Sequence, residues 1–269
     1  MSFPDSKMRT LKLTLGYDGA HFLGWQWQPN KRTIQGVLQE TITKITGEKS
    51  ACTASGRTDA GVHALGQVVS FDTHTWLACD VLTKALNAEL PDDMLVFDIV
   101  EAPLGFQALR EAVRKRYRYV IQDGRFPDLF ARNYVWHIYR RLDVEAMHQA
   151  AQTLLGEHDF ISYETTGSSR QTTVRTILDL LVERRQAELT DRVIIEVQAN
   201  GFLYNMVRNI AGTLAEVGKG KQPVTWPLEV LAAKDRRAAG VTAPAQGLFL
   251  VQVDYEPSPG NSIAGEPDL

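Results

Sequence analysis

The chain has few cysteines, no long apolar run and no recognisable leader, and these shortages limit what it can be. Its 269 residues include two cysteines, Cys52 and Cys79, too few for a disulfide framework and too far apart for a paired-cysteine motif. The six histidines lack zinc-site spacing, so we expect no metal. No apolar stretch approaches the roughly 20 residues of a membrane span, and the first residues do not resemble a targeting peptide. We therefore expect a soluble, cytoplasmic protein with no membrane contact.

Positive charge is also scarce overall, but it is unevenly distributed. The net charge is −3, from 29 basic and 32 acidic residues, which alone speaks against a nucleic-acid partner. However, residues 110–141 carry nine basic side chains against three acidic ones, whereas residues 80–101 carry six acidic ones against Lys84. This separation suits one face for RNA and another that stays acidic. It is equally compatible with ordinary solvated faces.

Hydrophobic periodicity predicts an α+β fold with a repeated order of elements. In the first half we expect, in chain order, a strand at Leu11–Tyr17, a helix capped by Thr33, strands at Ser50–Ser55 and Gly66–Thr73, a helix at Asp80–Leu90 and a strand at Met94–Val100. This is the βαββαβ order of a ferredoxin-like unit.

The second half repeats that order more loosely. The expected elements are strands at Val113–Gln122 and Tyr134–Tyr139, a helix at Val144–Leu155, strands at Val174–Arg184 and Arg192–Ala199, helices at Tyr204–Val217 and Pro227–Lys234, and a strand at Leu248–Tyr255. We thus expect two α+β domains, residues 9–104 and 105–255, with their sheets side by side and a cleft between them. Residues 1–8 and 256–269 are expected to be flexible ends.

A glycine-rich loop places a single carboxylate after the Ser50–Ser55 strand. The loop reads Gly56-Arg57-Thr58-Asp59-Ala60-Gly61, and a rigid scaffold would hold Asp59 there within reach of a ligand. The alternative is that Asp59 only closes an Asx-turn before Gly61.

Basic and aromatic residues alternate where the second half begins. In Arg116-Tyr117-Arg118-Tyr119 a strand would put the arginines on one face and the tyrosines on the other. Such a strand can hold RNA, with tyrosines stacking on bases and arginines on phosphates. It can equally be a sheet whose tyrosines pack in the core.

The helix expected from Tyr204 has a polar ridge. Asn205, Arg208, Asn209 and Gly212 stand at helical spacing on one face, and the glycine would let another group approach closely. If the ridge faces the cleft, Arg208 can pair with Asp59. Otherwise it is a solvated helix face.

Taken together, these segments resemble the tRNA pseudouridine synthase A family from about Leu11 to Tyr255. The matching segments are Tyr17-Asp18-Gly19-Ala20-His21-Phe22-Leu23-Gly24-Trp25-Gln26, Thr33-Ile34-Gln35-Gly36, Gly56-Arg57-Thr58-Asp59-Ala60-Gly61-Val62-His63, Arg116-Tyr117-Arg118-Tyr119, His158-Asp159-Phe160, Met206-Val207-Arg208-Asn209-Ile210 and Ala243-Pro244-Ala245-Gln246-Gly247-Leu248.

The resemblance implies the pseudouridine synthase fold and isomerisation of uridine to pseudouridine at positions 38, 39 and 40 of the tRNA anticodon stem-loop. It implies Asp59 as the catalytic aspartate, Tyr117 stacked against the target base, Arg208 as the partner of the aspartate and Arg57 as a further RNA-facing group. It also implies a homodimer that needs no cofactor.

One segment departs from the family. Where Phe-His-Ala-Arg is common, this chain has Phe106-Gln107-Ala108-Leu109, with Arg110 one position later. Two other functions stay open: a non-catalytic RNA-binding protein or tRNA chaperone, and a hydrolase of small glycosides or nucleosides, although that chemistry usually needs two carboxylates.

Overall fold

The computed structural model of the chain describes residues 7–165, 172–186 and 191–256. The expected flexible ends, residues 1–8 and 256–269, lie outside these ranges except for Lys7, Met8 and Glu256. None of the helices in the described ranges is both long and apolar enough to cross a membrane.

The first half has the expected order of elements. Its elements are β1 (Arg9–Tyr17), α1 (Ile34–Thr46), β2 (Thr53–Ala54), β3 (His63–Thr73), α2 (Cys79–Glu89) and β4 (Met94–Ala102). The Thr33 side chain caps α1 by accepting a hydrogen bond from the Gly36 amide, and Gly47 ends the helix in the left-handed conformation. The capping prediction is therefore confirmed.

The second half contains the expected elements and one further strand. In chain order they are β5 (Ala112–Asp123), β6 (Trp136–Ile138), α3 (Val144–Gln152), β7 (Gly156–Asp159), β8 (Val174–Arg185), β9 (Arg192–Ala199), α4 (Met206–Gly218), α5 (Trp226–Ala233) and β10 (Leu248–Tyr255). Four short 3-10 helices, at Gly19–His21, Ile161–Tyr163, Arg236–Ala238 and Ala245–Gly247, complete the described ranges. The sequence did not predict β7, whose four residues lack a clear alternation of apolar and polar side chains.

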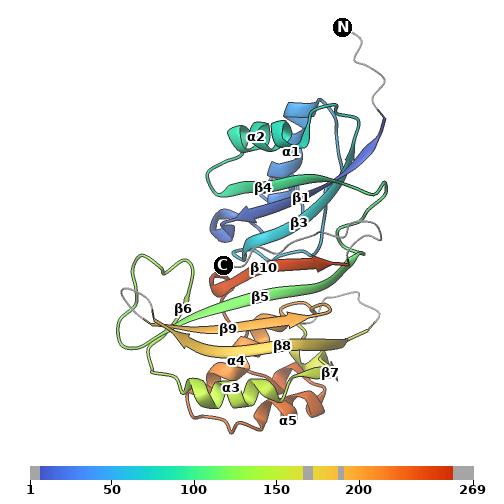
Figure 1. The fold of residues 1–269 in the computed structure, drawn as a ribbon. Coiled ribbons are helices and arrows are strands. Elements are labelled where there is room, and N and C mark those ends of the chain that lie inside the picture. The colour runs from blue at the N-terminus through green and yellow to red at the C-terminus, as the bar shows by residue number, and fades with distance from the viewer. Residues whose placement is uncertain (1–6, 166–171, 187–190, 257–269) are drawn as a thin grey trace, which may run out of the picture.

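One continuous sheet runs through both halves (Figure 1). Its strand order is β4-β1-β3-β10-β5-β9-β8-β7, with β2 beside β3 and β6 beside β5. Within each half the four strands of the βαββαβ unit therefore lie in the same order: fourth, first, third, second. The expected pair of ferredoxin-like halves is confirmed, and their sheets join where β10 runs parallel to β3.

The expected strand at Ser50–Ser55 is reduced to the two residues of β2, and the reason is competition for one edge of β3. The other edge of β3 is fully occupied by β1. On the free edge, β10 pairs with His63 and Ala64, and β2 pairs only with Val69 and Ser70. The chain must therefore leave the sheet after Ala54, and this departure creates the loop that carries Asp59.

Helices cover the two halves separately (Figure 1). In the first half α2 packs against β4 and touches α1, and in the second half α3 packs on β8 and α4 on β5. Buried aliphatic side chains from both halves form one hydrophobic core. Cys52 is buried and Cys79 is half-buried, and both cysteines are free.

Gly212 in α4 allows a backbone contact that no larger residue would tolerate. A Cβ atom at this position would lie 1.7 Å from the carbonyl oxygen of Val241. We expect Gly212→Ala to lower the free energy of unfolding by about 3 kcal/mol, the upper range for overpacking. Gly201→Ala is the matched control, because its Cβ would make only ordinary contacts with the Arg175 side chain. Chemical denaturation checks both, and equal stability of the two variants would contradict the prediction.

Candidate active site

The loop that carries Asp59 is braced by a buried polar network. Gln67 on β3 is fully buried; its Nε2 donates to the Gly56 carbonyl at 2.9 Å, and its Oε1 accepts from Ser55 Oγ at 2.6 Å. The Tyr17 hydroxyl lies 2.8 Å from Thr58 Oγ1. Because buried polar groups must be satisfied, this network fixes the backbone on the N-terminal side of Asp59.

A turn at Asp59 then sends the chain into β3. The Val62 amide donates to the Asp59 carbonyl at 3.1 Å, and Gly61 adopts a φ of +78° that favours glycine. The turn that the sequence allowed is therefore present, but the backbone carbonyl closes it. This leaves the Asp59 carboxylate available for another partner.

That partner is Arg208 in the first turn of α4. One Arg208 guanidinium nitrogen lies 3.5 Å from Asp59 Oδ2. The same guanidinium donates to the Ala243 carbonyl at 2.7 Å and to Asn205 Oδ1 at 2.9 Å. The structure thus brings together two residues that the sequence could only link conditionally, from opposite halves of the chain.

Partial burial sets the electrostatics of the pair. The Asp59 side chain is 32% exposed and that of Arg208 is 17% exposed. Burial raises the pKa of Asp59 above its ordinary value, and the positive charge of Arg208 offsets only part of this effect. The carboxylate is therefore a stronger base than a solvated aspartate, which suits attack on carbon or removal of a proton.

Asn205 holds Arg208 in place. It precedes α4 with a φ of +59°, a left-handed conformation that asparagine adopts more readily than other side chains except glycine, and its Nδ2 donates to Thr165 Oγ1 at 3.2 Å. Asparagine at this position therefore serves both the backbone conformation and the orientation of the arginine.

Two substitutions at Asn205 separate these roles. Asn205→Gly keeps the backbone conformation and removes the bond to Arg208, whereas Asn205→Ala removes the bond and adds strain. We expect both to lower kcat about tenfold, the worth of one well-placed hydrogen bond. Only the alanine variant should also lose about 1 kcal/mol of stability. Turnover of tRNA, the substrate that the family resemblance implies, and thermal melting measure the two effects, and a glycine variant with unchanged kcat would refute the positioning role.

Tyr117 lies on the same face of β5 as Lys115, which is two residues earlier. Lys115 Nζ donates to the Ser55 carbonyl at 2.6 Å, at the start of the loop that carries Asp59, so this face of β5 is directed toward that loop. Tyr117 is 8% exposed and makes an edge-on contact with Phe202, with ring centroids 5.0 Å apart. Two residues further along, the Tyr119 hydroxyl donates to the Pro244 carbonyl. Sequence reasoning missed Lys115 because nothing in its local pattern distinguishes it from the arginines around it.

Arg57 points outward from the loop and is exposed. Beyond Asp59, Ala60 and Gly61 line a cavity of about 370 Å³ together with Arg132, Asn133 and Gln246. Polar and basic groups thus surround the outer side of the aspartate loop. Among the described residues no group of three or more His, Cys, Asp or Glu side chains could hold a metal ion.

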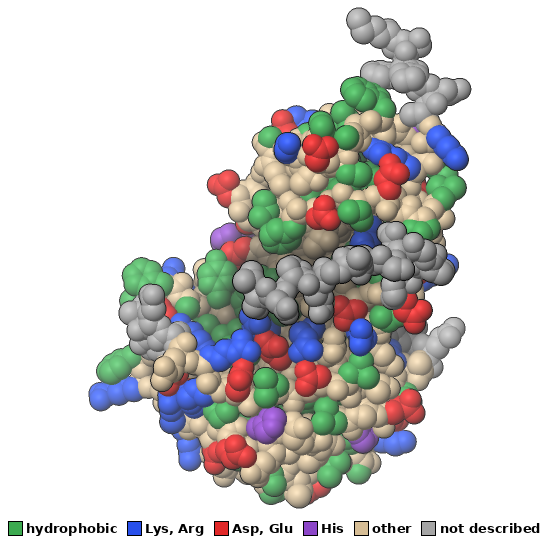
Figure 2. Space-filling view, in the orientation of Figure 1, with side chains coloured by type: hydrophobic (Ala, Val, Ile, Leu, Met, Phe, Trp, Pro, Cys, Tyr) green, Lys and Arg blue, Asp and Glu red, His purple; other side chains and the backbone are tan. Residues whose placement is uncertain are grey.

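The arginines of β5 are paired with carboxylates of the protein itself. Arg118 lies 2.6 Å from Glu196 on the neighbouring strand β9, and Arg116 lies 2.9 Å from Asp179 on β8, one strand further. Figure 2 shows basic and acidic side chains interspersed over this part of the sheet. Cross-strand ion pairs therefore balance this basic segment within the protein.

The polar ridge of α4 is covered rather than open. Asn209 is fully buried and donates to the Tyr163 carbonyl at 2.7 Å, while its Oδ1 accepts from Arg236 and Thr242. The group that approaches Gly212 closely is the backbone of Val241. Only the Arg208 end of the ridge reaches the site, which corrects the interpretation of the ridge as one functional face.

The segment that departs from the family pattern forms the connection between β4 and β5. Ala108 is buried, and its amide donates to Ser70 Oγ at 3.0 Å. Leu109, at the position where an arginine is common, is 53% exposed, and Arg110 beside it is exposed too. The connector thus keeps one basic group at the surface, displaced by one residue.

Comparison with known proteins agrees with this geometry. The family model described as tRNA pseudouridine synthase matches residues 15–108 and 150–256, most of the chain. The chain belongs to the tRNA pseudouridine synthase family. Proteins named tRNA pseudouridine synthase A are 45% identical in Thermoanaerobacter sp. (strain X514), over 92% of this chain and 100% of the relative, and 44% identical in Myxococcus xanthus, over 94% of each. The reaction of this family is the isomerisation of uridine to pseudouridine in tRNA.

Among solved structures, a chain of a Cbf5-Nop10-Gar1 complex is 13% identical to this synthase, with a TM-score of 0.35. The match covers 92% of the synthase and 58% of the other chain. A likeness at that level adds nothing to the assignment, which stands on the family match and the full-length relatives.

Proposed function

We propose that this enzyme isomerises uridine at positions 38, 39 and 40 of the tRNA anticodon stem-loop, with Asp59 as its catalytic residue. The observation that carries the proposal is the half-buried Asp59 carboxylate, held on a braced loop and paired with Arg208. Tyr117 and Arg57 are proposed to bind the target nucleotide, Tyr117 through its ring and Arg57 through phosphate contact.

The reaction moves one bond and needs no outside group. The bond from ribose C1′ to uracil N1 breaks, the base turns, and C1′ joins C5; N1 gains a proton and C5 loses one. Asp59 can serve as a nucleophile at C1′, add to C6 of the base or remove the C2′ proton, and its ionised form is required for each. We therefore propose catalysis without a cofactor.

The target must leave the base stack before it reacts. Extruding a nucleotide costs a few kcal/mol, which stacking and charge contacts in the enzyme must repay. Tyr117 is largely buried and meets Phe202 edge-on, so we expect the base to displace that contact. Arg57, exposed on the aspartate loop, is proposed to contact the adjoining phosphate.

Tritium release tests this proposal. Unmodified tRNA labelled with tritium at uracil C5 should lose label when the enzyme is added, with chelator present or absent. Transcripts with cytidine at position 38, 39 or 40 should each lose the share of label from that position. No release from the full transcript would refute the activity, and dependence on unchelated metal would refute the cofactor-free proposal.

The alternatives lead to different results. An RNA-binding protein or tRNA chaperone would bind the transcript without releasing tritium. A nucleoside hydrolase would act on free uridine and yield uracil. The family match and the pairing of one carboxylate with one arginine both favour the isomerase.

We further propose that the enzyme acts in the cytoplasm as a homodimer and that residues 9–104 and 105–255 are its two domains. The family resemblance supports the dimer. The repeated strand order, with its joint at β3 and β10, supports the division. Sedimentation equilibrium of the purified chain tests the homodimer, and the mass of a single chain at micromolar concentration would contradict it.

A further inference from the structure

The loop between β5 and β6, residues 124–135, exposes several large apolar side chains to solvent. Phe126 is 70% exposed, Leu129 66% and Phe130 85%. Clustered apolar groups at this level of exposure mark an interaction site. In Figure 2 green and blue side chains stand out on the side where Figure 1 places this loop.

Polar contacts hold the loop in this conformation. Gln122 at the end of β5 donates to the Phe126 carbonyl at 2.8 Å and accepts from the Asp128 amide at 2.9 Å. The Asp128 carboxylate accepts from the Phe130 amide and lies 2.5 Å from an Arg192 guanidinium nitrogen. The aromatic side chains are therefore presented by a fixed backbone.

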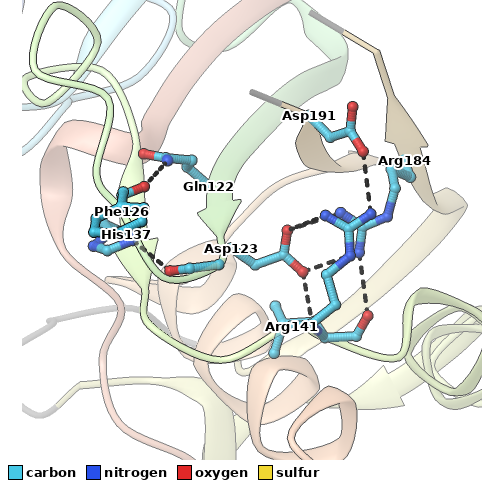
Figure 3. A network of polar contacts seen from close by, with 9 residues as sticks. Gln122, Asp123, Phe126, His137, Arg141, Arg184 and Asp191 are labelled. Carbon is cyan, nitrogen blue, oxygen red and sulfur yellow. Dashed lines mark hydrogen bonds and ion pairs between the residues drawn. The ribbon is translucent and has the colours of Figure 1, made fainter. Parts of the chain in front are cut away.

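A buried ion pair fixes the base of the loop (Figure 3). The fully buried Asp123 carboxylate accepts two hydrogen bonds from Arg184, at 2.8 and 2.9 Å, and one from the Leu142 amide at 2.7 Å. Burial favours protonation of Asp123, but the bonds from Arg184 and Leu142 outweigh it and lower its pKa. The loop is thus anchored to β8 by a charged pair at neutral pH.

The far end of the loop reaches the aspartate loop. The Tyr134 hydroxyl donates to Asp18 Oδ2 at 2.6 Å, and Arg132 and Asn133 line the 370 Å³ cavity together with Ala60 and Gly61. One loop thus carries both the exposed phenylalanines and two residues of the cavity beside the Asp59 loop.

Charge favours RNA as the occupant. Arg125 lies over the Phe126 ring at 5.0 Å, and Arg132 donates to the Leu129 carbonyl. In the described part of the chain neither is paired with a carboxylate, in contrast to Arg116 and Arg118. A two-fold contact centred on this loop would bring the arginines of two copies toward one another, which opposes a second copy of the chain at that position. Phosphates and unstacked bases suit arginines interleaved with phenylalanines.

We infer that the β5–β6 loop is a docking site for unpaired tRNA nucleotides next to the target uridine, with Phe126 and Phe130 stacking on bases and Arg125 and Arg132 binding phosphates. This inference rests on the proposed function and adds a binding site beyond the target pocket. The loop would hold the neighbouring nucleotides in place while the target is extruded.

Binding of unmodified tRNA by Phe126→Ala/Phe130→Ala tests the site. We expect Kd to rise at least tenfold, with kcat at saturating tRNA reduced less than threefold, because base stacking on an aromatic side chain contributes to binding and these side chains do not touch the reacting atoms. Arg132→Gln should make the slope of log K against log salt less negative by about one. Trp76→Ala is the control, since Trp76 is 65% exposed and lies in the first half between β3 and α2.

The outcomes separate the two proposals. Wild-type tritium release with unchanged Kd in the double variant overturns the docking site and leaves the activity standing. Absence of wild-type release refutes the activity itself. If sedimentation shows that the double variant has a smaller assembly than the wild type, the loop is a subunit contact and the inference is wrong. Thermal melting confirms that each variant is folded.

Discussion

Asp59→Asn is expected to abolish tritium release, by at least about a thousandfold, while the chain stays folded and still binds tRNA. The amide cannot attack carbon or accept a proton, and loss of an acid–base or nucleophilic group typically costs factors of 10² to 10⁴ or more. The braced loop does not depend on the carboxylate, because Gln67, Tyr17 and the Val62 turn hold its backbone. Single-turnover release and a filter-binding assay measure the two properties.

The pKa of Asp59 adds a prediction about stability. Burial raises that pKa above the ordinary 3.8, so the folded chain holds this proton at pH values where the unfolded chain has lost it. Between the two pKa values the free energy of unfolding therefore falls as pH rises, and the loss persists above the folded pKa. Asp59→Asn removes this cost, so its melting temperature at neutral pH should equal or exceed that of the wild type. Marked destabilisation would show that Asp59 has a structural role.

Arg208→Gln should have the second largest effect. Without the positive charge 3.5 Å from Asp59 Oδ2, the pKa of Asp59 should rise further, because Arg208 lowers it in the wild type. We expect kcat/KM at pH 7 to fall about a hundredfold. The acidic limb of the pH profile, where activity disappears as Asp59 takes up its proton, should move to higher pH.

Arg208→Lys is the matched control. Lysine keeps the charge but cannot reproduce the forked bonds to Asn205 and the Ala243 carbonyl. Its acidic limb should stay near that of the wild type while kcat remains reduced. If the limb has the same position in all three proteins, Arg208 does not control the ionisation of Asp59.

The sequence predicted most of the fold because its signals are local. The Thr33 cap and Gly47 bound α1, and alternating apolar residues marked the long strands. The order of elements then implied the ferredoxin-like halves that the sheet contains. The exceptions are short strands: β2 and β6 are shorter than expected, and β7 was not expected, because the extent of a short strand depends on which neighbouring strand pairs with it.

The sequence predicted which residues belong to the candidate site, but it did not predict which other residues contact them. Helical spacing correctly grouped Arg208 with Asn209 and Gly212, but it could not show that residues 240–242 cover the last two. Likewise, a count of charges along β5 could not include Asp179 and Glu196, which approach Arg116 and Arg118 only through strand pairing. Sequence periodicity shows which residues share a face, and tertiary contacts decide what that face meets.

The parallel joint between β3 and β10 has a consequence for the order in which a working enzyme forms. β10 is the last strand of the described residues, and it joins the edge of β3 beside the aspartate loop to β5. During synthesis on the ribosome the Asp59 loop emerges early and Arg208 much later, and the strand that connects the two halves appears after both. A nascent chain that ends before Leu248 therefore lacks this joint, so catalytic competence should arise only after β10 has been synthesised.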